Sequence, residues 1–532
     1  MRLLSASALA AGIFAVTFSS ATLMAQTVSV TTPRGRTVRV STITPSILRV
    51  ENFPEGSVPS ATLSGAPAAR DVDGKIARDG DITSLTTPSG LSVTVSALTG
   101  AVTIDGGARR RVSDSGVRSF TDGLQSLSLS VSPGGSFYGA GERGYSFNLA
   151  GDTLVMYNKQ NYGYRAGEER IRQMNITMPL FLSPDGYAVV FDDYAAASMV
   201  MADPIVYTTE SSVPVSYYFV NSAGSLASLV PELSSLTGRQ ELPPLWSLGY
   251  ITSKYGYHTQ AETLGVVDTL KQAGYPLDGV VLDLYWYGKE QDMGRLAWDP
   301  VQWPDHKRML ADLRDKGVNT VLISQPYVLR NGEGRSNYDT LSEAGLLLAD
   351  STGAPQEVTI WVGEGGMFDV SNPATRRWLA DRYRDLTLEG VGGWWGDLGE
   401  PEVHPESGLH ANGLSTRLYH NRYGNDWSSI IHSLYKEQFP DTRLMTMMRG
   451  GTTGLQQYSV FPWSTDVSRS WEGLQPQITI MLNSGLSGLG YMSHDVGGFA
   501  IDEEAPYDPE LYVRWRNHPH RGSYNRGPRG PN

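Results

Sequence analysis

Hydrophobic residues recur with different periods in the two parts of this sequence. This difference constrains the fold more than any other feature. From about residue 27 to 235, short runs such as "SVTVSALTG" and "YAVVFDD" alternate apolar and polar side chains, with Gly, Pro, Asp and Ser between the runs. A period of two is typical of strands with one buried face. A β-sandwich over residues 26–240 is therefore the simplest fold for this part of the chain.

Beyond about residue 245, apolar segments that suit buried strands alternate with amphipathic segments of helical period. This order predicts a parallel α/β layout. We expect strands at 246–253, 279–288, 319–328, 392–400, 443–450, 461–467 and 488–498, and helices at 260–273, 305–316, 373–389, 413–437 and 468–484. A TIM barrel has eight such units. Residues 241–515 therefore predict a (β/α)8-type barrel that lacks its last unit, with a doubly wound sheet as the alternative fold.

Polar side chains recur near the carboxyl end of nearly every predicted strand. They are Asp283, Asp397, Arg449, Asp466 and Asp495. In a barrel these strand ends share one face, which is where active sites lie, whereas a doubly wound sheet would bind ligands at its switch point.

The segment from 516 to 532 breaks the pattern. It is rich in Arg, Gly and Pro, and Tyr524 is its only large apolar side chain. Such a composition predicts neither a strand nor a packed helix. We expect an aberrant tail produced by a frameshift or premature end, with a native basic tail as the alternative. A barrel without its eighth strand has open edges, so we expect the chain as written to be poorly soluble or inactive.

The first 25 residues are typical of a secretory signal peptide. Arg2 is followed by a short apolar run and small residues, and we expect cleavage after Ala25, or alternatively after Ala21. The apolar run is too short for a membrane span, and no later segment is long enough for one. We therefore expect an exported protein, periplasmic or secreted.

Composition excludes several other classes of protein. The chain has no cysteine, which rules out a disulfide framework and thiolate metal sites. Its net charge of −12 argues against nucleic acid or an anionic membrane as the main partner. The glycines of "GAGERG" (139–144) lie in the β-rich part with no helix after them, so they do not predict a dinucleotide site. No zinc, calcium or phosphate-loop motif is present, and we expect neither cofactor nor metal.

Asp397 and Asp466 are the strongest candidates for catalysis. They lie in "GGWWGDLGE" and "FPWSTDVSRSW", each at the end of a predicted strand. Two carboxylates across a sugar-sized cleft are what glycoside hydrolysis requires. We expect the aromatic neighbours of Asp466 to keep it protonated, and Arg449 to keep Asp397 ionised. Helix capping or ion pairing is the alternative role for either carboxylate.

The sequence leaves more than one role open for most of the nearby residues. Asp283 either grips sugar hydroxyls or caps the next helix, and Glu400 braces its loop rather than reacting. Trp361, Trp394 and Trp395 either stack on a sugar or belong to the core. The glycines around Asp397 would leave room for a sugar to approach.

At these residues the chain resembles glycoside hydrolase family 31. "WWGDLGEP" matches the nucleophile segment of that family, Trp-x-Asp-x-x-Glu-Pro, and "FPWSTD" resembles its acid/base segment. "FYGAGERG", "LTGRQELPPLWSLGY", "LDLYWYG", "MFDVSNP", "MMRGG" and "SHDVGGF" follow in family order between about 135 and 515. The arginine–histidine pair expected after "RW" is absent, and neither His518 nor His520 is assigned its role.

The resemblance implies a retaining mechanism on α-linked sugars, with Asp397 as nucleophile and Asp466 as general acid/base. It implies carboxyl groups roughly 5 Å apart. Together with our reading of the aromatic residues, it predicts a pocket for the terminal sugar formed by Asp283, Trp361, Trp395, Arg449, Trp463 and Phe499.

We therefore expect an exo-acting α-glycosidase that removes terminal α-linked glucose from oligosaccharides. The form "GWWGDLGEPEVHP" is closer to family members that transfer glucose between α-1,4-linked oligosaccharides, so a 4-α-glucosyltransferase is the alternative. A carbohydrate-binding protein without activity is the second alternative.

Overall fold

The computed structural model describes residues 26–61, 63, 72, 74–222, 224–501, 508–517 and 523–527. The expected signal peptide, residues 1–25, lies outside the described residues and stays a prediction. Among the described residues, no helix combines the length and the apolar character needed to cross a membrane.

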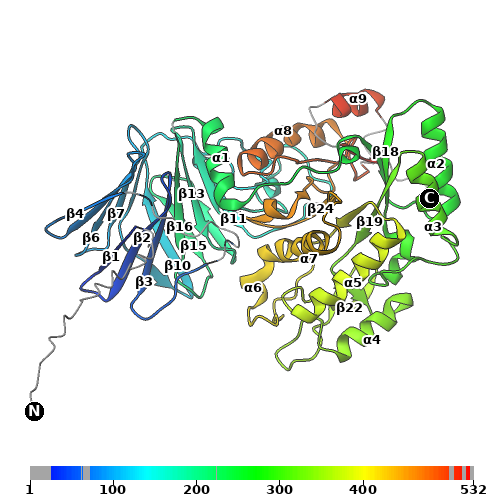
Figure 1. Cartoon of the computed structure of the whole chain (residues 1–532), viewed down its shortest axis with the longest axis horizontal. Coiled ribbons are helices and arrows are strands. Elements are labelled where there is room, and N and C mark those ends of the chain that lie inside the picture. The colour runs from blue at the N-terminus through cyan, green and yellow to red at the C-terminus, as the bar shows by residue number, and fades with distance from the viewer. Residues whose placement is uncertain are drawn as a thin grey trace, which may run out of the picture.

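Two antiparallel sheets form the N-terminal part, which confirms the predicted sandwich (blue to cyan strands, Figure 1). One sheet has the order β1 (Thr27–Thr31), β2 (Arg36–Thr44), β3 (Ile47–Pro54), β16 (Ser216–Asn221), β13 (Tyr187–Asp192) and β12 (Leu180–Ser183). The other has the order β11 (Thr153–Met156), β14 (Ala197–Val200), β15 (Ile205–Thr209), β10 (Leu124–Ser130), β8 (Arg111–Asp114), β7 (Val102–Asp105), β6 (Ser92–Ser96), β5 (Ile82–Thr86) and β4 (Lys75–Asp79), and β9 (Ser119–Thr121) pairs with β10.

Strands β13 and β16 join this sandwich to the rest of the molecule. All of their residues are buried, because one face of each packs into the sandwich core and the other into the barrel core. Val189 and Phe219 lie on the sandwich side, whereas Val190 and Val220 lie on the barrel side. Burial on both faces explains why "YAVVFD" is nearly continuous in apolar residues rather than alternating. Helix α1 (Leu226–Thr237) packs against the barrel side of both strands.

The second part is built on a sheet of parallel strands, as predicted for a barrel wall. Its order is β25 (Val460–Phe461), β24 (Thr446–Met448), β23 (Gly393–Gly396), β19 (Asn319–Ser324), β18 (Leu277–Leu282), β17 (Tyr250–Lys254) and β26 (Ser523–Gly527). The first six strands are neighbours in chain order and parallel. Such an order favours the barrel over the doubly wound alternative, in which the strand order reverses.

Two strand predictions are wrong. Residues 488–498 form no strand, although Ser493 makes an isolated parallel bridge to Trp463. Conversely, residues 523–527 of the tail form β26 and pair in parallel with β17. Strand pairing uses backbone N–H and C=O groups, which every residue here provides, so a composition poor in apolar residues does not prevent a strand at an open edge. The predicted loss of solubility or activity stays a prediction.

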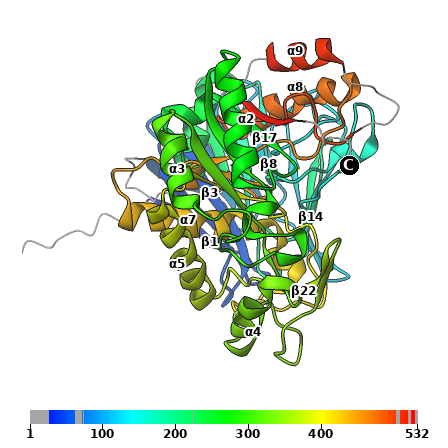
Figure 2. The same ribbon diagram turned by 90° about the vertical axis from the view of Figure 1, so that its right-hand side faces the viewer.

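Helices lie around this sheet and around the segments inserted into it (Figures 1 and 2). They are α2 (Gln260–Gln272), α3 (His306–Asp315), α4 (Arg335–Glu343), α5 (Pro373–Glu389), α6 (Thr416–Tyr419), α7 (Tyr423–Gln438), α8 (Trp471–Leu486) and α9 (Pro509–Asn517). Both views show α9 beside α8, where Trp515 and Leu511 pack with Ile480. The sequence did not predict α4 or the small antiparallel sheet β20 (Tyr327–Leu329), β22 (Gly363–Met367) and β21 (Val358–Ile360), which are inserted between β19 and α5.

Candidate active site

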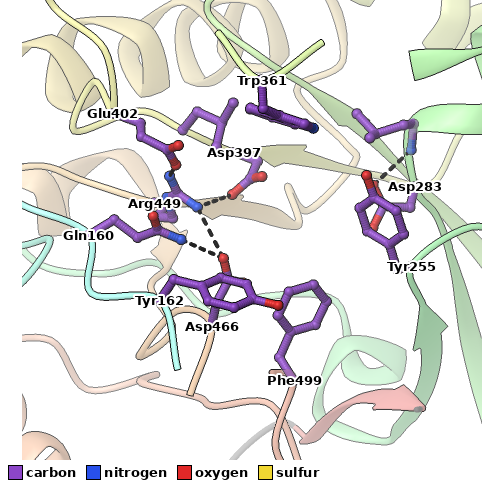
Figure 3. A pocket seen from close by; sticks show the side chains of 12 residues that line it. Gln160, Tyr162, Tyr255, Asp283, Trp361, Asp397, Glu402, Arg449, Asp466 and Phe499 are labelled. Atoms are coloured by element: carbon purple, nitrogen blue, oxygen red, sulfur yellow. Dashed lines mark hydrogen bonds and ion pairs between the residues drawn. The ribbon is translucent and has the colours of Figure 1, made fainter. Parts of the chain in front are cut away.

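A cavity of about 280 Å³ opens at the carboxyl ends of the parallel strands. Figure 3 shows that its walls come from both parts of the molecule. The lining residues are Gln160, Tyr162, Tyr255, Asp283, Leu284, Trp361, Asp397, Leu398, Glu402, Arg449, Asp466 and Phe499.

Asp397 directly follows β23, and its backbone N–H donates to the carbonyl oxygen of Ser324 at the end of β19. This extension of the sheet holds the start of the loop, so the carboxylate projects into the cavity (Figure 3). The next residue, Leu398, has a φ of 60° and is buried. A left-handed conformation is strained for a leucine and persists only where the surrounding packing enforces it.

Asp466 enters the cavity from the segment after β25. Its carboxylate accepts a hydrogen bond of 2.5 Å from the side-chain amide of Gln160, which belongs to the loop after β11. The preceding Thr465 has a φ of 62°, a rare conformation for a β-branched residue. Both candidate carboxylates therefore adjoin a strained backbone position, which is common at functional sites.

The guanidinium of Arg449 lies between the two candidate carboxylates. Its Nη1 is 3.3 Å from an oxygen of Asp397 and 3.7 Å from an oxygen of Asp466. The two oxygens are therefore no farther apart than the sum of these distances. That limit is compatible with the separation of about 5–5.5 Å between the carboxyl groups of retaining glycosidases.

Arg449 also binds two glutamates from the loop after Asp397. Its Nε lies 2.8 Å from Glu400, and its Nη2 forms an ion pair with Glu402. Burial alone would lower the pKa of Arg449, but the surrounding carboxylates raise it well above its usual value. This arginine is therefore a permanent cation at the base of the cavity.

Glu400 is fully buried and does not line the cavity. Burial raises its pKa to about 7, although Arg449 acts in the opposite direction. Its contact with Arg449 agrees with the predicted role in bracing the loop. Behind it lies Glu142 of the "GAGERG" segment, which is also fully buried. Burial raises the pKa of Glu142 well above its usual range, and the charge of Glu400 adds to this rise.

The glycines near Asp397 serve close packing, in contrast to the room for sugar that we expected. A Cβ on Gly399 would lie 2.4 Å from the carbonyl oxygen of Arg449, and Gly450, with a φ of 95°, approaches the backbone of Gly399 equally closely. The two loops can touch only because neither position has a side chain. Their contact keeps Arg449 beside Asp397.

Two profiles of known families match the chain. The profile described as "Glycosyl hydrolases family 31 TIM-barrel domain" matches residues 240–518, more than half of the sequence. The profile described as "Glycosyl hydrolase 31 N-terminal galactose mutarotase-like domain" matches residues 37–199. This chain belongs to glycoside hydrolase family 31.

Curated relatives of this family 31 chain include glucosidases and a xylosidase. Alpha-glucosidase 2 of Bacillus thermoamyloliquefaciens is 27% identical over 399 residues, which cover 71% of this chain and 48% of the relative. An alpha-xylosidase of Lactiplantibacillus pentosus is 26% identical over 395 residues, covering 73% and 50%. Neutral alpha-glucosidase AB of Homo sapiens is 31% identical over 303 residues, covering 55% and 31%. The chain thus spans about half the length of the first two of these relatives.

Solved family 31 structures share the fold. A dextranase of Flavobacterium johnsoniae superposes with a TM-score of 0.86 at 20% identity, covering 95% of this chain and 64% of that chain. The cycloalternan-forming enzyme of Listeria monocytogenes superposes with a TM-score of 0.80 at 21% identity, covering 93% and 49%. At these identities the likeness shows the fold alone.

The structure brings most of the predicted residues of the family 31 site together. Asp283, Trp361, Arg449 and Phe499 line one cavity with the two candidate carboxylates. Asp283 also accepts a hydrogen bond of 2.7 Å from the backbone N–H of Leu284, at the start of the 3₁₀ helix Leu284–Tyr287. The predicted capping role of Asp283 is confirmed, whereas its contact with sugar hydroxyls stays a prediction, although the residue also lines the cavity.

Three aromatic residues lie elsewhere than we expected. Trp395 and Trp463 are fully buried, pack edge to face with ring centroids 5.7 Å apart, and do not line the cavity. Trp395 belongs to β23 and Trp463 follows β25, and both side chains belong to the barrel core. Trp471 points away from Asp466, because its indole N–H donates to Asp508. Asp466 contacts Gln160 and Arg449, and its predicted protonation stays a prediction.

Sequence reasoning missed several residues that line the cavity. Gln160 and Tyr162 come from the loop after β11, about 300 residues before Asp466, and no local pattern marks them. Tyr255 follows β17 and Glu402 follows Pro401 in the predicted nucleophile segment. Of these four residues, only Glu402 could have been found from the sequence, because it lies in the "GEPE" segment quoted above.

Proposed function

We propose that this chain is a retaining exo-acting α-glycosidase that removes terminal α-linked glucose from oligosaccharides. The observation that carries the proposal is that the carboxylates of Asp397 and Asp466 both contact Arg449 in one small cavity. A cavity of about 280 Å³ is near the lower end for small-ligand sites and suits a single terminal sugar. The names of the curated glucosidases support glucose, whereas the name of the xylosidase leaves xylose as a substrate to test.

In the proposed mechanism Asp397 attacks the anomeric carbon, and the bond to the leaving oxygen breaks. Asp466 donates its proton to that oxygen, so the leaving sugar departs as a neutral alcohol and Asp397 is bound covalently to the glycosyl group. Asp466, now ionised, then removes a proton from water, and the resulting hydroxide displaces Asp397 at the anomeric carbon. Arg449 orients Asp397 before attack through their ion pair.

Gln160 can assist both states of Asp466. Its amide N–H donates to the ionised carboxylate, as the structure shows. After rotation of the amide, its oxygen can accept the proton of the neutral acid, because an amide offers both a donor and an acceptor. The loop after β11 would thus hold the acid/base while its charge changes.

A 4-α-glucosyltransferase is the second candidate, favoured by the aromatic rim of the cavity. The side chains of Trp361 and Tyr162 both line the cavity yet remain about half exposed, at 54% and 49%. Exposed aromatic faces at the entrance can stack on a second sugar. A sugar held there would compete with water for the glycosyl-enzyme intermediate.

Incubation of the full chain with maltotriose separates these two activities. Net release of glucose is expected for hydrolysis, whereas simultaneous formation of longer and shorter oligosaccharides would indicate transfer. If the products show neither pattern while maltose still binds, the chain is a binding protein and the proposal fails.

Two variants test the roles of the carboxylates. Asp397→Asn should lower kcat on the order of 10³-fold or more with every substrate, because the nucleophile is lost. Asp466→Asn should lose far less with 4-nitrophenyl α-glucoside than with maltose, because nitrophenolate leaves without a proton. Equal losses of Asp466→Asn on both substrates would contradict its role as the acid.

A further inference from the structure

Three histidines form a continuous chain of contacts between the two parts of the molecule. His410 Nδ1 is 2.9 Å from Asp369, and His410 Nε2 is 2.9 Å from His404 Nε2. His404 Nδ1 is 3.2 Å from His420 Nδ1, and His420 Nε2 is 2.9 Å from the backbone carbonyl oxygen of Asn158. All six ring nitrogens are therefore used in four contacts. They face one another in pairs and do not converge on a point, so the arrangement is not that of a metal site.

The two ends of this chain are both acceptors. Asp369 offers a carboxylate oxygen, and Asn158 offers a backbone carbonyl, which has no proton to give. Burial opposes ionisation of Asp369, but the hydrogen bond from His410 and the backbone N–H of Ala411 outweigh it and lower the pKa of Asp369. Both terminal contacts therefore need a proton on the histidine.

Counting protons shows that three neutral imidazole rings cannot supply a proton to each of these four contacts. Each of the four contacts needs one N–H, whereas three neutral imidazoles carry three. With only three protons, one contact would place a nitrogen lone pair against another lone pair, or against an oxygen of Asp369 or Asn158, at 2.9–3.2 Å. A buried polar contact without a proton costs free energy.

We propose that His404, His410 and His420 together hold four protons at neutral pH, with the extra charge on His410 beside Asp369. His410 then donates from Nδ1 to Asp369 and from Nε2 to His404. His404 donates from Nδ1 to His420, and His420 donates from Nε2 to Asn158. Every contact carries one proton, and the imidazolium is paired with a carboxylate.

The surroundings agree with this placement of the charge. Burial lowers the pKa of His420 to about 4, and the nearby Arg417 adds to this effect, although the bond to Asn158 opposes it. Burial and the two other imidazoles lower the pKa of His404. Both rings are therefore neutral at pH 7, which leaves His410, in contact with Asp369, for the charge.

No other ionised group packs directly against the three rings among the described contacts. Tyr157 stacks on His420 with ring centroids 4.0 Å apart, Tyr419 lies against His410, and Tyr423 against His404. Burial raises the pKa of all three tyrosines, so they stay neutral. Arg417 is paired with Glu210 and Glu406, and Tyr419 donates to Asp426.

The chain of histidine contacts links two segments of the protein that reach the cavity. His404 lies two residues after Glu402, which pairs with Arg449. Asn158 lies two residues before Gln160, which contacts Asp466. We infer that the charged chain makes His404, His410 and His420 positioning residues, because it holds both segments through directional hydrogen bonds.

Nuclear magnetic resonance of the full chain with ¹⁵N-labelled histidine tests the proton count directly. At pH 7, His410 should show two protonated ring nitrogens, His404 a neutral ring with the proton on Nδ1, and His420 one with the proton on Nε2. Three neutral rings at pH 7 would overturn the proposal. The variant His432→Gln, which removes a histidine outside the chain on α7, should leave these signals unchanged and serves as the control.

Asp369→Asn should remove the need for the fourth proton. An amide can donate to His410 Nδ1, and the same three downstream bonds then form with three neutral rings. The amide oxygen can still accept from the N–H of Ala411, whereas the hydrogen bond from the backbone N–H of Ser371 to the other oxygen of Asp369 is lost. In this variant His410 should become neutral with its proton on Nε2, whereas His404 and His420 keep their states. An imidazolium that persists on His410 would contradict the count.

Hydrogen exchange tests the positioning role. Backbone amides of residues 402–411 should exchange faster at pH 7 in Asp369→Asn than in the wild type, because the ion pair between His410 and Asp369 is lost. Equal exchange rates in the two proteins would refute the role of the charge.

Discussion

A single arginine organises the cavity at the scale of individual residues. Arg449 touches Asp397, Glu400, Glu402 and Asp466, and it is fully buried. Removing one partner of a buried ion pair is costly because the remaining charge has no compensation. The network therefore keeps both candidate carboxylates in place more firmly than either contact alone.

Glu142 is another buried carboxyl group, and burial makes its ionised form unfavourable in the folded protein. Because its folded pKa is raised, the folded state holds a proton that the unfolded state has lost, so stability falls as the pH rises from about 4.5 through the folded value. Glu142→Gln cannot ionise and should escape this loss. We expect its apparent unfolding temperature to exceed that of the wild type at pH 8, on the order of 2–4 °C, and the difference to shrink toward pH 4.5.

The control for this prediction is Glu343→Gln, on the exposed end of α4, which should change the unfolding temperature little at either pH. A Glu142→Gln variant that is equally or less stable than the wild type at pH 8 would show that Glu142 is ionised in the fold.

At the scale of elements, strand ends and helix caps determine where the site residues lie. Asp283 and Asp397 directly follow strands β18 and β23, and Asp466 follows β25 closely. The parallel strands bring their carboxyl ends to one edge, which places these side chains around one cavity. Helices α2, α5 and α8 begin at Thr259, Asn372 and Ser470, each of which accepts a backbone hydrogen bond with its side chain.

The cap of α5 can be tested against an uncapped helix. Asn372 accepts from the backbone N–H of Ala374, whereas Asp305 holds the same position before α3 without a capping bond. Asn372→Ala should lower the free energy of unfolding by about 1 kcal/mol, and Asp305→Ala should lower it by less. Urea denaturation of both variants gives the comparison, and equal costs would show that the Asn372 bond contributes nothing.

The same caps explain which elements could be predicted. The bounds of α2 and α5 lie within about a residue of expectation, because Thr259, Asn372 and Gly390 mark their ends. Residues 413–437 were expected to form one helix, but they divide into α6 and α7 around the 3₁₀ helix His420–Arg422. His420 lies at this break and bonds to Asn158, a tertiary contact that helical periodicity does not reveal.

At the scale of the whole molecule, the sandwich and the barrel share one cavity and one interface. Asn158 is central to that interface. Its side-chain oxygen accepts from the backbone and hydroxyl of Thr177, and its amide donates to Gly451 of the barrel. Its backbone N–H donates to Asn421. Every one of these partners is buried.

Asn158→Ala should therefore leave several buried groups without hydrogen bonds. We expect the free energy of unfolding to fall by roughly 2–4 kcal/mol, since each unsatisfied buried group costs about 1–3 kcal/mol. The proposed activity should fall as well, because Gln160 lies two residues away. Asn412→Ala, in an exposed loop, is the matched control and should change stability by about 0.5 kcal/mol or less. If Asn158→Ala lowers the free energy of unfolding no more than Asn412→Ala does, the interface does not depend on Asn158.

The sequence by itself determined the two-part architecture and the strand ends that carry the candidate carboxylates. Those features follow from periodicity and from chemistry within a few residues, as in "WWGDLGEP", where a polar side chain must end an apolar strand. Only the tertiary structure decided which residues from outside the sequence motifs complete the cavity. It placed Gln160 on Asp466, turned Trp395 and Trp463 into the core, and paired residues 523–527 with β17. It also joined Asp369, the three histidines and Asn158. The physical reason is that these contacts join residues far apart in the chain, and each depends on the packing of whole elements rather than on any local pattern.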